Sequence, residues 1–166
     1  MQDMSSRDGM TGVYNRRHRE ILLRNESDHC RCHYQEATLL IIDIDHFKSI
    51  NDTWGHGIGD ETIIALTRQL QITLRGRDII GRFGGDEFAV IMCGTSANSA
   101  IAALSRVHER LNALRLPGAP LVMLRISVGV APLTPQIGHY RGWLKSADMA
   151  LYKAKNAGRN RTEVAA

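Results

Sequence analysis

The amino-acid sequence predicts an α+β fold, in which helices pack on a central sheet that contains antiparallel strands. The run TLLIIDI at 38–44 is short, apolar and rich in β-branched residues, which is typical of a buried strand. The apolar segments 78–83 and 87–93 are joined through Gly84 and Gly85, which is the pattern of a β-hairpin. Amphipathic periodicity around these strands predicts helices that cover the sheet.

The remaining elements are predicted from periodicity and from residues that end helices. The predicted helices are 14–26, 46–55, 58–74, 97–114 and 144–156. The last two end before Pro117 and Gly158. A further strand is predicted at 121–130, whereas the polar segment 27–37 is expected to be irregular. Three apolar side chains of the short helix are expected in the core: Phe47, Ile50 and Trp54.

The composition predicts one globular domain, 1–166, with 43% hydrophobic and 23% charged residues. The formal net charge of +4 favours phosphate-bearing partners but is too small to indicate nucleic acid. No apolar run approaches the roughly 18–20 residues of a membrane span, and no signal peptide is visible over 1–12. The three cysteines do not form a disulfide framework, which indicates a reducing compartment.

Two carboxylates, Asp86 and Glu87, follow the glycines of the hairpin, although a turn needs only the glycines. Asp43 and Asp45 are two residues apart at the end of strand 38–44, so their side chains share a face. If that strand lies beside the hairpin, Asp43 comes near Asp86 and Glu87. Clustered carboxylates repel, a divalent cation relieves the repulsion, and Mg²⁺ prefers one or two carboxylates together with phosphates. The residues therefore predict a Mg²⁺–nucleotide site for phosphoryl chemistry.

Four motifs, in this order, resemble those of the GGDEF-domain diguanylate cyclases. They are DGMTGVYNRR at 8–17, DIDHFKSINDTWGHGIGD at 43–60, GGDEF at 84–88 and ALYKAKNAGRN at 150–160. The first departs from the family pattern at Met10 and Val13, where leucines are usual. The resemblance covers nearly the whole chain. It implies a fold like the palm of polymerases and adenylyl cyclases, and an enzyme that condenses two GTP into cyclic di-GMP and two pyrophosphates.

The resemblance assigns metal and catalytic roles to the carboxylates. Asp43, the carbonyl of Ile44 and Asp86 would hold Mg²⁺, or Mn²⁺ in its place, ordinarily as two ions per half-site. One ion would activate the 3′-hydroxyl and the other would neutralise the triphosphate. Asp86 would also accept the proton, with Glu87 assisting nearby. The family pattern gives Asp45 a lesser role than its spacing alone indicates.

The same resemblance assigns substrate contacts. Asn51 and Asp60 match the guanine-reading positions. A carboxylate accepts hydrogen bonds from guanine N1–H and its exocyclic amine, a pair that adenine does not offer, so GTP is expected rather than ATP. Lys48, Lys155 and Arg159 would contact phosphates.

An RxxD motif, Arg75 to Asp78, is separated from Gly84 by five residues. That spacing matches the family's inhibitory product site, so the resemblance implies feedback inhibition by cyclic di-GMP. Arginine suits phosphate and guanine edges. Arg106, on the next predicted helix, is expected as an additional contact.

Because one domain binds one GTP, the resemblance implies a transient homodimer bridged by substrate. Neither nucleic acid nor a membrane is expected to contact this domain. We expect a cytoplasmic location, either alone or as the cytoplasmic domain of an inner-membrane sensor. The polar start MQDMSSRDG is expected to be the cut end of a longer protein.

Other interpretations of these residues remain open. The domain could be a catalytically inactive relative that binds cyclic di-GMP or GTP, or a nucleic-acid binder. Asp43 and Asp45 could be caps of the following helix, and Lys155 and Arg159 plain charges near a helix end. The cluster HCRCH at 29–33 is too crowded for the usual zinc spacings, so a solvated loop is expected there.

Overall fold

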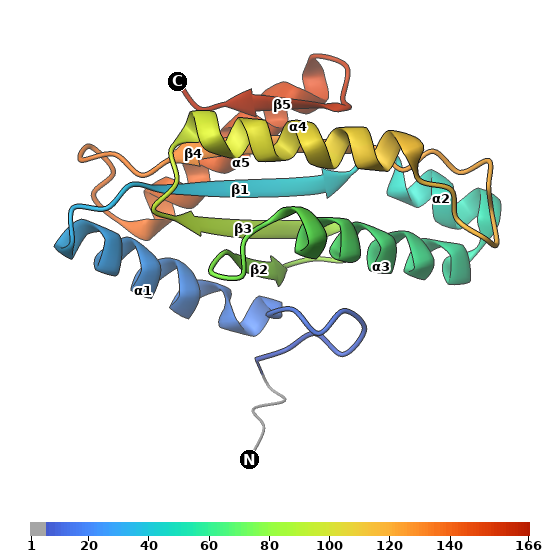
Figure 1. Ribbon diagram of the computed structural model, residues 1–166, viewed down its shortest axis with the longest axis horizontal. Helices are drawn as coiled ribbons and strands as arrows, with labels where there is room; N and C mark the ends of the chain where they lie inside the picture. Colours follow the sequence, from blue (N-terminus) through green and yellow to red (C-terminus); the bar gives the residue numbers. More distant parts are fainter. Residues whose placement is uncertain (1–5) are drawn as a thin grey trace.

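The computed structural model (Figure 1) describes residues 6–166, so 1–5 of the predicted domain lie outside the described part of the chain. Within that part the elements are a 3₁₀ turn Arg16–His18, α1 Arg19–Cys32, β1 Ala37–Ile44, α2 Phe47–Trp54, α3 His56–Thr73, β2 Ile79–Arg82, β3 Glu87–Cys93, α4 Ala97–Ala113, β4 Ile126–Pro132, α5 Tyr140–Asn156 and β5 Arg161–Val164. No helix within 6–166 is long and apolar enough to cross a membrane.

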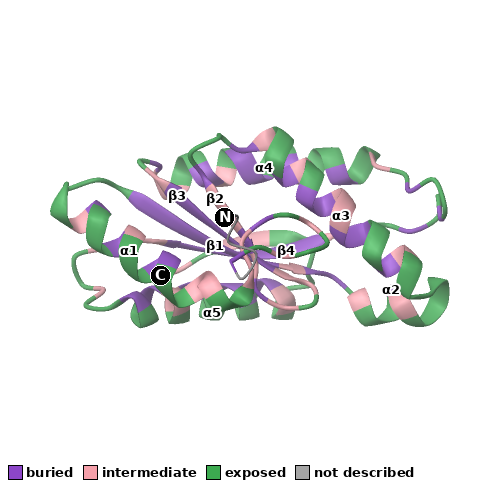
Figure 2. Ribbon diagram, turned by 90° about the horizontal axis from the view of Figure 1, so that it is seen from below, coloured by how far each residue is buried: buried purple, intermediate pink, exposed green. Residues whose placement is uncertain are grey.

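The strands form one sheet in the order β2-β3-β1-β4-β5. β1 lies at its centre and pairs antiparallel with both β3 and β4, while β2 and β3 form the predicted hairpin. β5 was not predicted from the sequence, and it adds to β4 as a parallel edge strand. Helices α3 and α4 cover one face of the sheet and α1 and α5 cover the other (Figures 1 and 2). The predicted α+β class is confirmed.

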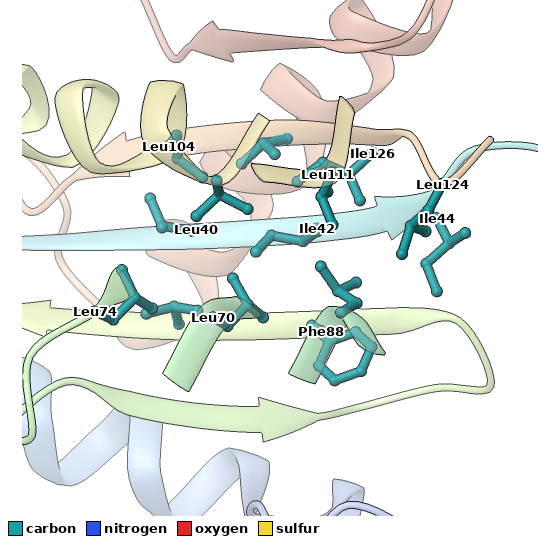
Figure 3. Packing of buried hydrophobic residues seen from close by; sticks show 14 of the residues in the cluster. Leu40, Ile42, Ile44, Leu70, Leu74, Phe88, Leu104, Leu111, Leu124 and Ile126 are labelled. Carbon is teal, nitrogen blue, oxygen red and sulfur yellow. The ribbon is translucent and has the colours of Figure 1, made fainter. Parts of the chain in front are cut away.

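Both faces of β1 are buried, which explains its continuous apolar sequence. Alternate residues Leu40, Ile42 and Ile44 pack against α3 and α4 in one cluster (Figure 3). Leu39 and Ile41 belong to a second cluster with α1 and α5. Because side chains alternate along a strand, Asp43 continues the Leu39–Ile41 series and faces the α1 and α5 layer. The site therefore lies at the end of the second apolar cluster.

The first helix and the strand at 121–130 were predicted with the wrong bounds. α1 continues to Cys32, because Ser27 and Cys30 extend its buried stripe. The HCRCH cluster is therefore not a solvated loop: its first four residues form the last turn of α1. β4 begins only at Ile126. Val122 and Leu124 are buried alternately as in a strand, but they have no ladder partner.

Other differences are smaller. α5 begins at Tyr140, four residues earlier than predicted, and the side chain of His139 caps it by accepting from the Arg141 amide at 3.2 Å. Ile50 is buried and Phe47 packs against the core as expected. Trp54, which was expected in the core, is 40% exposed. It is the last residue of α2.

Candidate active site

The end of β1 lies beside the glycine turn of the hairpin. Asp43 is paired with Glu87 across the β1–β3 ladder, so their side chains share a face. The amide of Ile44 donates to the carbonyl of Asp86 at 3.2 Å. The juxtaposition of Asp43 with Asp86 and Glu87, expected from the sequence, is present.

The turn that carries Asp86 is held by Arg82. The guanidinium of Arg82 donates twice to the Gly85 carbonyl, at 2.8 and 3.2 Å. The amide of Phe83 closes the turn by donating to the carbonyl of Glu87 at 2.8 Å. These bonds fix the backbone from which the Asp86 side chain extends.

Arg82 is in turn bound by the N-terminal motif, a contact that sequence reasoning missed. It forms an ion pair with Asp8 at 3.4 Å, and both side chains are mostly buried. Asp8 also accepts from the amide and hydroxyl of Thr11, at 3.0 and 2.7 Å. Burial alone would raise the pKa of Asp8, but the hydrogen bonds from Thr11 and the charge of Arg82 outweigh it and lower that pKa. The motif at 8–17 therefore supports the signature turn.

Helix α5 contributes a cation to the cluster. Lys155 forms an ion pair with Asp43, and both groups are partly buried. The position of α5 is set by close packing on β4. A Cβ at Gly129 would lie 2.1 Å from the Ala147 carbonyl oxygen and 2.4 Å from the Leu151 amide nitrogen, so only glycine allows this approach.

A fourth carboxylate, Asp148, belongs to the cluster and was not predicted. Burial, and then the charge of Asp43, raise the pKa of both Asp86 and Glu87. Asp148 raises the pKa of Glu87 further, and its own pKa is raised by burial despite the charge of Arg19. Asp148 lies seven residues before Lys155, two helical turns away, and that spacing is a signal that could have found it. Nearby cations, Lys155 and Arg19 among them, oppose the raised pKa values of these carboxyl groups but do not outweigh burial.

The donors fit a hard divalent cation that also binds a nucleotide. Within residues 6–166, no three His, Cys, Asp or Glu side chains gather so that they alone could hold a metal ion. Two carboxylates, Asp43 and Asp86, instead suit Mg²⁺, which takes one or two protein carboxylates and completes its shell with phosphates and water.

The predicted guanine-reading residues lie at the junction of α2 and α3. Asn51 is partly buried on α2. A Cβ added to Gly59 would lie only 1.9 Å from the amide oxygen of Asn51. Asp60 follows Gly59 directly and is exposed. The structure therefore places Asn51 against Gly59, the residue that precedes Asp60. Lys48 is exposed one turn before Asn51.

Arg159 lies just after the end of α5, next to Asn160, whose amide binds Asp45. Arg159 is exposed and has a left-handed backbone, with φ of 64°. Asp45 lies on the face of the sheet expected from its spacing. Its carboxylate is buried and accepts from the Ser127 hydroxyl at 2.6 Å and the Asn160 amide at 2.9 Å. Asp45 thus binds protein groups and is separate from the carboxylate cluster.

The three residues of the predicted product site line one small cavity of about 40 Å³ on the far side of the hairpin. They are Arg75, Asp78 and Arg106. One oxygen of Asp78 accepts from the Arg75 amide at 2.9 Å, while the other is buried without a hydrogen-bond partner among the described residues. Burial raises the pKa of Asp78. Such an unpartnered acceptor is costly unless a ligand satisfies it.

Comparison with known proteins places the chain in one family. The family model for "Diguanylate cyclase, GGDEF domain" matches residues 5–161. The chain is 78% identical over all 166 residues to the "Probable diguanylate cyclase DgcC" of Escherichia coli K12, and 35% identical over 161 residues to the "Diguanylate cyclase DosC" of the same strain. It spans 45% and 34% of the lengths of these two relatives, respectively, so it corresponds to less than half of each.

Solved structures agree in fold. The GGDEF domain of DgcB from Caulobacter crescentus, crystallised in complex with c-di-GMP, matches with a TM-score of 0.92 and 28% identity, covering 99% of this chain and 98% of that one. The active GGEEF domain of a diguanylate cyclase from Vibrio cholerae matches with a TM-score of 0.85 and 29% identity, covering 92% and 97%. With the motifs, the site geometry and these matches in agreement, the chain belongs to the GGDEF domain family.

Proposed function

We propose that this chain is the catalytic domain of a diguanylate cyclase, which condenses two GTP into cyclic di-GMP and two pyrophosphates. The observation that carries the proposal is the meeting of Asp43 and Asp86 beside Lys155 at the end of β1, with the GGDEF signature intact. The names of the two Escherichia coli relatives support the same activity.

The carboxylate cluster supplies the metal and proton chemistry. Asp43, the Ile44 carbonyl and Asp86 would hold Mg²⁺, or Mn²⁺, as two ions per half-site. When bound, the metal supplies activation of the 3′-hydroxyl and neutralisation of the triphosphate. Asp86, the third residue of the GGDEF signature, would also accept the proton of the 3′-hydroxyl. Glu87, paired with Asp43, assists beside it.

The remaining residues bind the substrate. Asn51 and Asp60 read the guanine at the α2–α3 junction, where Asn51 packs against Gly59, the residue before Asp60. Cations bind the phosphates and balance the acidic cluster: Lys48, Lys155 and Arg159.

The reaction requires two domains, because each binds one GTP. In a transient homodimer, the 3′-oxygen of each GTP attacks the α-phosphorus of the other. One O3′–P bond forms and one P–O bond to pyrophosphate breaks at each centre, and the 3′-hydroxyl proton passes to Asp86. The location proposed for this GTP-consuming domain is the cytoplasm.

Product inhibition is proposed at Arg75, Asp78 and Arg106. The unpartnered oxygen of Asp78 is suited to accept from a guanine edge, and the two arginines line the same cavity. The complex of the Caulobacter crescentus domain with c-di-GMP supports product binding within this family.

The test is to mix the chain with Mg²⁺ and GTP over a range of protein concentrations and to measure cyclic di-GMP by chromatography. We expect product formation to rise faster than linearly with protein concentration, because the active species is a dimer. A chain that binds cyclic di-GMP but forms no pyrophosphate at high concentration would instead be a receptor.

A further inference from the structure

Asp45 is a buried carboxylate that the proposed chemistry does not use. Its side chain is 6% exposed, and Ser127, one of its partners, is fully buried. Its two oxygens accept from different segments, the Ser127 hydroxyl on β4 and the Asn160 amide after α5. Its own amide donates to the Arg125 carbonyl at 2.8 Å. One side chain therefore connects the end of β1 to β4 and to the turn between α5 and β5.

That turn has a backbone that L-residues adopt only under constraint. Arg159 and Asn160 are consecutive and left-handed, with φ of 64° and 47°. Asparagine tolerates this conformation, but for Arg159 it is strained and must be imposed by its surroundings. The amide of Arg159 donates to the Ala154 carbonyl at 3.0 Å, which anchors the turn on the helix side. The bond from Asn160 to Asp45 anchors it on the strand side.

The two anchors place Arg159 relative to the catalytic strand. Asp45 is separated from Asp43 by one residue, so any shift of the turn relative to Asp45 is a shift relative to the metal-binding residues. Arg159 is itself exposed, and its side chain makes no ion pair in the described structure. Its position therefore depends on where its backbone is held.

We propose that Asp45 is a positioning residue, which fixes Arg159 against the end of β1 so that its guanidinium meets the phosphates of GTP. This inference rests on the proposed function, because it takes the phosphate contact of Arg159 from there. Asp45 acts through hydrogen bonds, so an asparagine can replace it: the amide oxygen accepts from Asn160 and the amide nitrogen donates to the Ser127 hydroxyl. Alanine cannot.

The test is a double-mutant cycle on the whole chain. Asp45→Ala, Asp45→Asn and Ser127→Ala are each made alone and combined with Arg159→Ala. The affinity for 3′-deoxy-GTP with Mg²⁺ is measured by calorimetry, together with kcat and KM for GTP. The 3′-deoxy nucleotide lacks the nucleophile, so its binding does not depend on turnover. Asp28→Asn, an exposed carboxylate change on α1, is the control, and thermal unfolding reports stability.

We expect Asp45→Ala to weaken 3′-deoxy-GTP binding and raise KM about tenfold, and Asp45→Asn to recover most of this loss. In the Arg159→Ala background, Asp45→Ala should change affinity less than about twofold, because the contact it positions is already gone. Ser127→Ala should lose less affinity for 3′-deoxy-GTP, and that loss should likewise depend on Arg159. If Asp45→Ala does not fold, Ser127→Ala takes its place in the double-mutant cycle.

Equal losses with and without Arg159 would overturn the inference while leaving the cyclase proposal intact, because Asp45 would then only stabilise the fold. A recovery of stability but not of affinity in Asp45→Asn would also overturn it. If the wild-type chain neither forms cyclic di-GMP nor binds 3′-deoxy-GTP, the proposed function fails, and the inference that rests on it fails too.

Discussion

Lys155 and Asp43 form an ion pair between the last-but-one residue of α5 and the last-but-one residue of β1. This pair joins a residue proposed to bind phosphate to one proposed to bind metal. Lys155 also lowers the pKa of Asp86 and of Asp148, in opposition to burial. It is therefore one of the cations that offset the carboxylate cluster, together with Arg82 and Arg19.

Removing this cation should reduce catalysis more than stability. A hydrogen bond between charged groups is worth about 1.5–3 kcal/mol, and the partial exposure of Lys155 reduces that, so we expect kcat/KM of Lys155→Ala to fall about tenfold. Lys153→Ala is the matched control, because Lys153 is exposed on the same helix. Steady-state assays of both variants check this. Equal activities in Lys155→Ala and Lys153→Ala would show that Lys155 has no role in the active site.

Substituting two glycines of α3, Gly57 and Gly59, allows an effect on guanine recognition to be distinguished from an effect on helix stability. A Cβ at Gly59 would lie 1.9 Å from the Asn51 amide oxygen, whereas a Cβ at Gly57 would meet nothing within 4 Å. The atom in the way at Gly59 is the end of a side chain, so Gly59→Ala should displace the Asn51 amide and leave the fold intact. We expect its KM for GTP to rise up to about tenfold, as for a lost hydrogen bond.

Gly57→Ala is the control for that change, because it adds the same methyl group to the same helix. Its KM should match that of the wild type, and its stability should stay equal or rise slightly through better helix propensity. KM and melting temperature are measured for both variants. If Gly59→Ala loses stability but keeps its KM, Asn51 has no part in recognition.

The raised pKa of Asp86 makes a prediction about stability and pH. Burial and the charge of Asp43 raise this pKa above its unfolded value of about 3.9. Between those two values the folded chain retains a proton that the unfolded chain has released. The free energy of unfolding therefore decreases as pH rises through this window, and the cost of ionising Asp86 in the folded chain is present above it.

Asp86→Asn should remove that cost. We expect its melting temperature to exceed that of the wild type at pH 7.5, with the difference decreasing as the pH is lowered toward 4. Scanning fluorimetry at both pH values measures it, with the exposed Asp28→Asn as control. Mg²⁺ with nucleotide should stabilise the wild type more than this variant, since ligand binding stabilises only where the site is complete. If, without ligand, Asp86→Asn is less stable than the wild type at pH 7.5, the expected cost of ionising Asp86 is contradicted.

Much of the site could be predicted because its residues lie in local sequence patterns. The apolar run of β1 and the glycine turn each define a strand end, and pairing of the two strands brings Asp43 to Glu87. Those patterns need only neighbouring residues. The ion pair of Asp8 with Arg82 spans 74 positions, and no periodicity links them, so only the folded chain reveals it.

The missed elements are those whose structure depends on distant partners. β5 is short and polar, and it exists because β4 offers it a parallel edge after α5 has crossed the sheet. The start of β4 was predicted too early, because local alternation indicated a strand where no neighbouring strand is present. Val122 and Leu124 alternate in burial, but the segment has no strand beside it until Ile126 meets Ile44.

The product site should be separable from catalysis, because Arg75 and Asp78 lie across the hairpin from the carboxylate cluster and line a cavity of their own. We expect Arg75→Ala to weaken cyclic di-GMP binding about tenfold or more and to relieve inhibition, since hydrogen bonds to charged groups are lost. Asp78→Asn should act in the same direction, because the buried, unpartnered oxygen loses its charge.

Arg68→Ala, an exposed change on α3, is the control. Calorimetry with cyclic di-GMP and initial rates with added product measure the two effects. Wild-type affinity in Arg75→Ala would place product binding elsewhere on the domain.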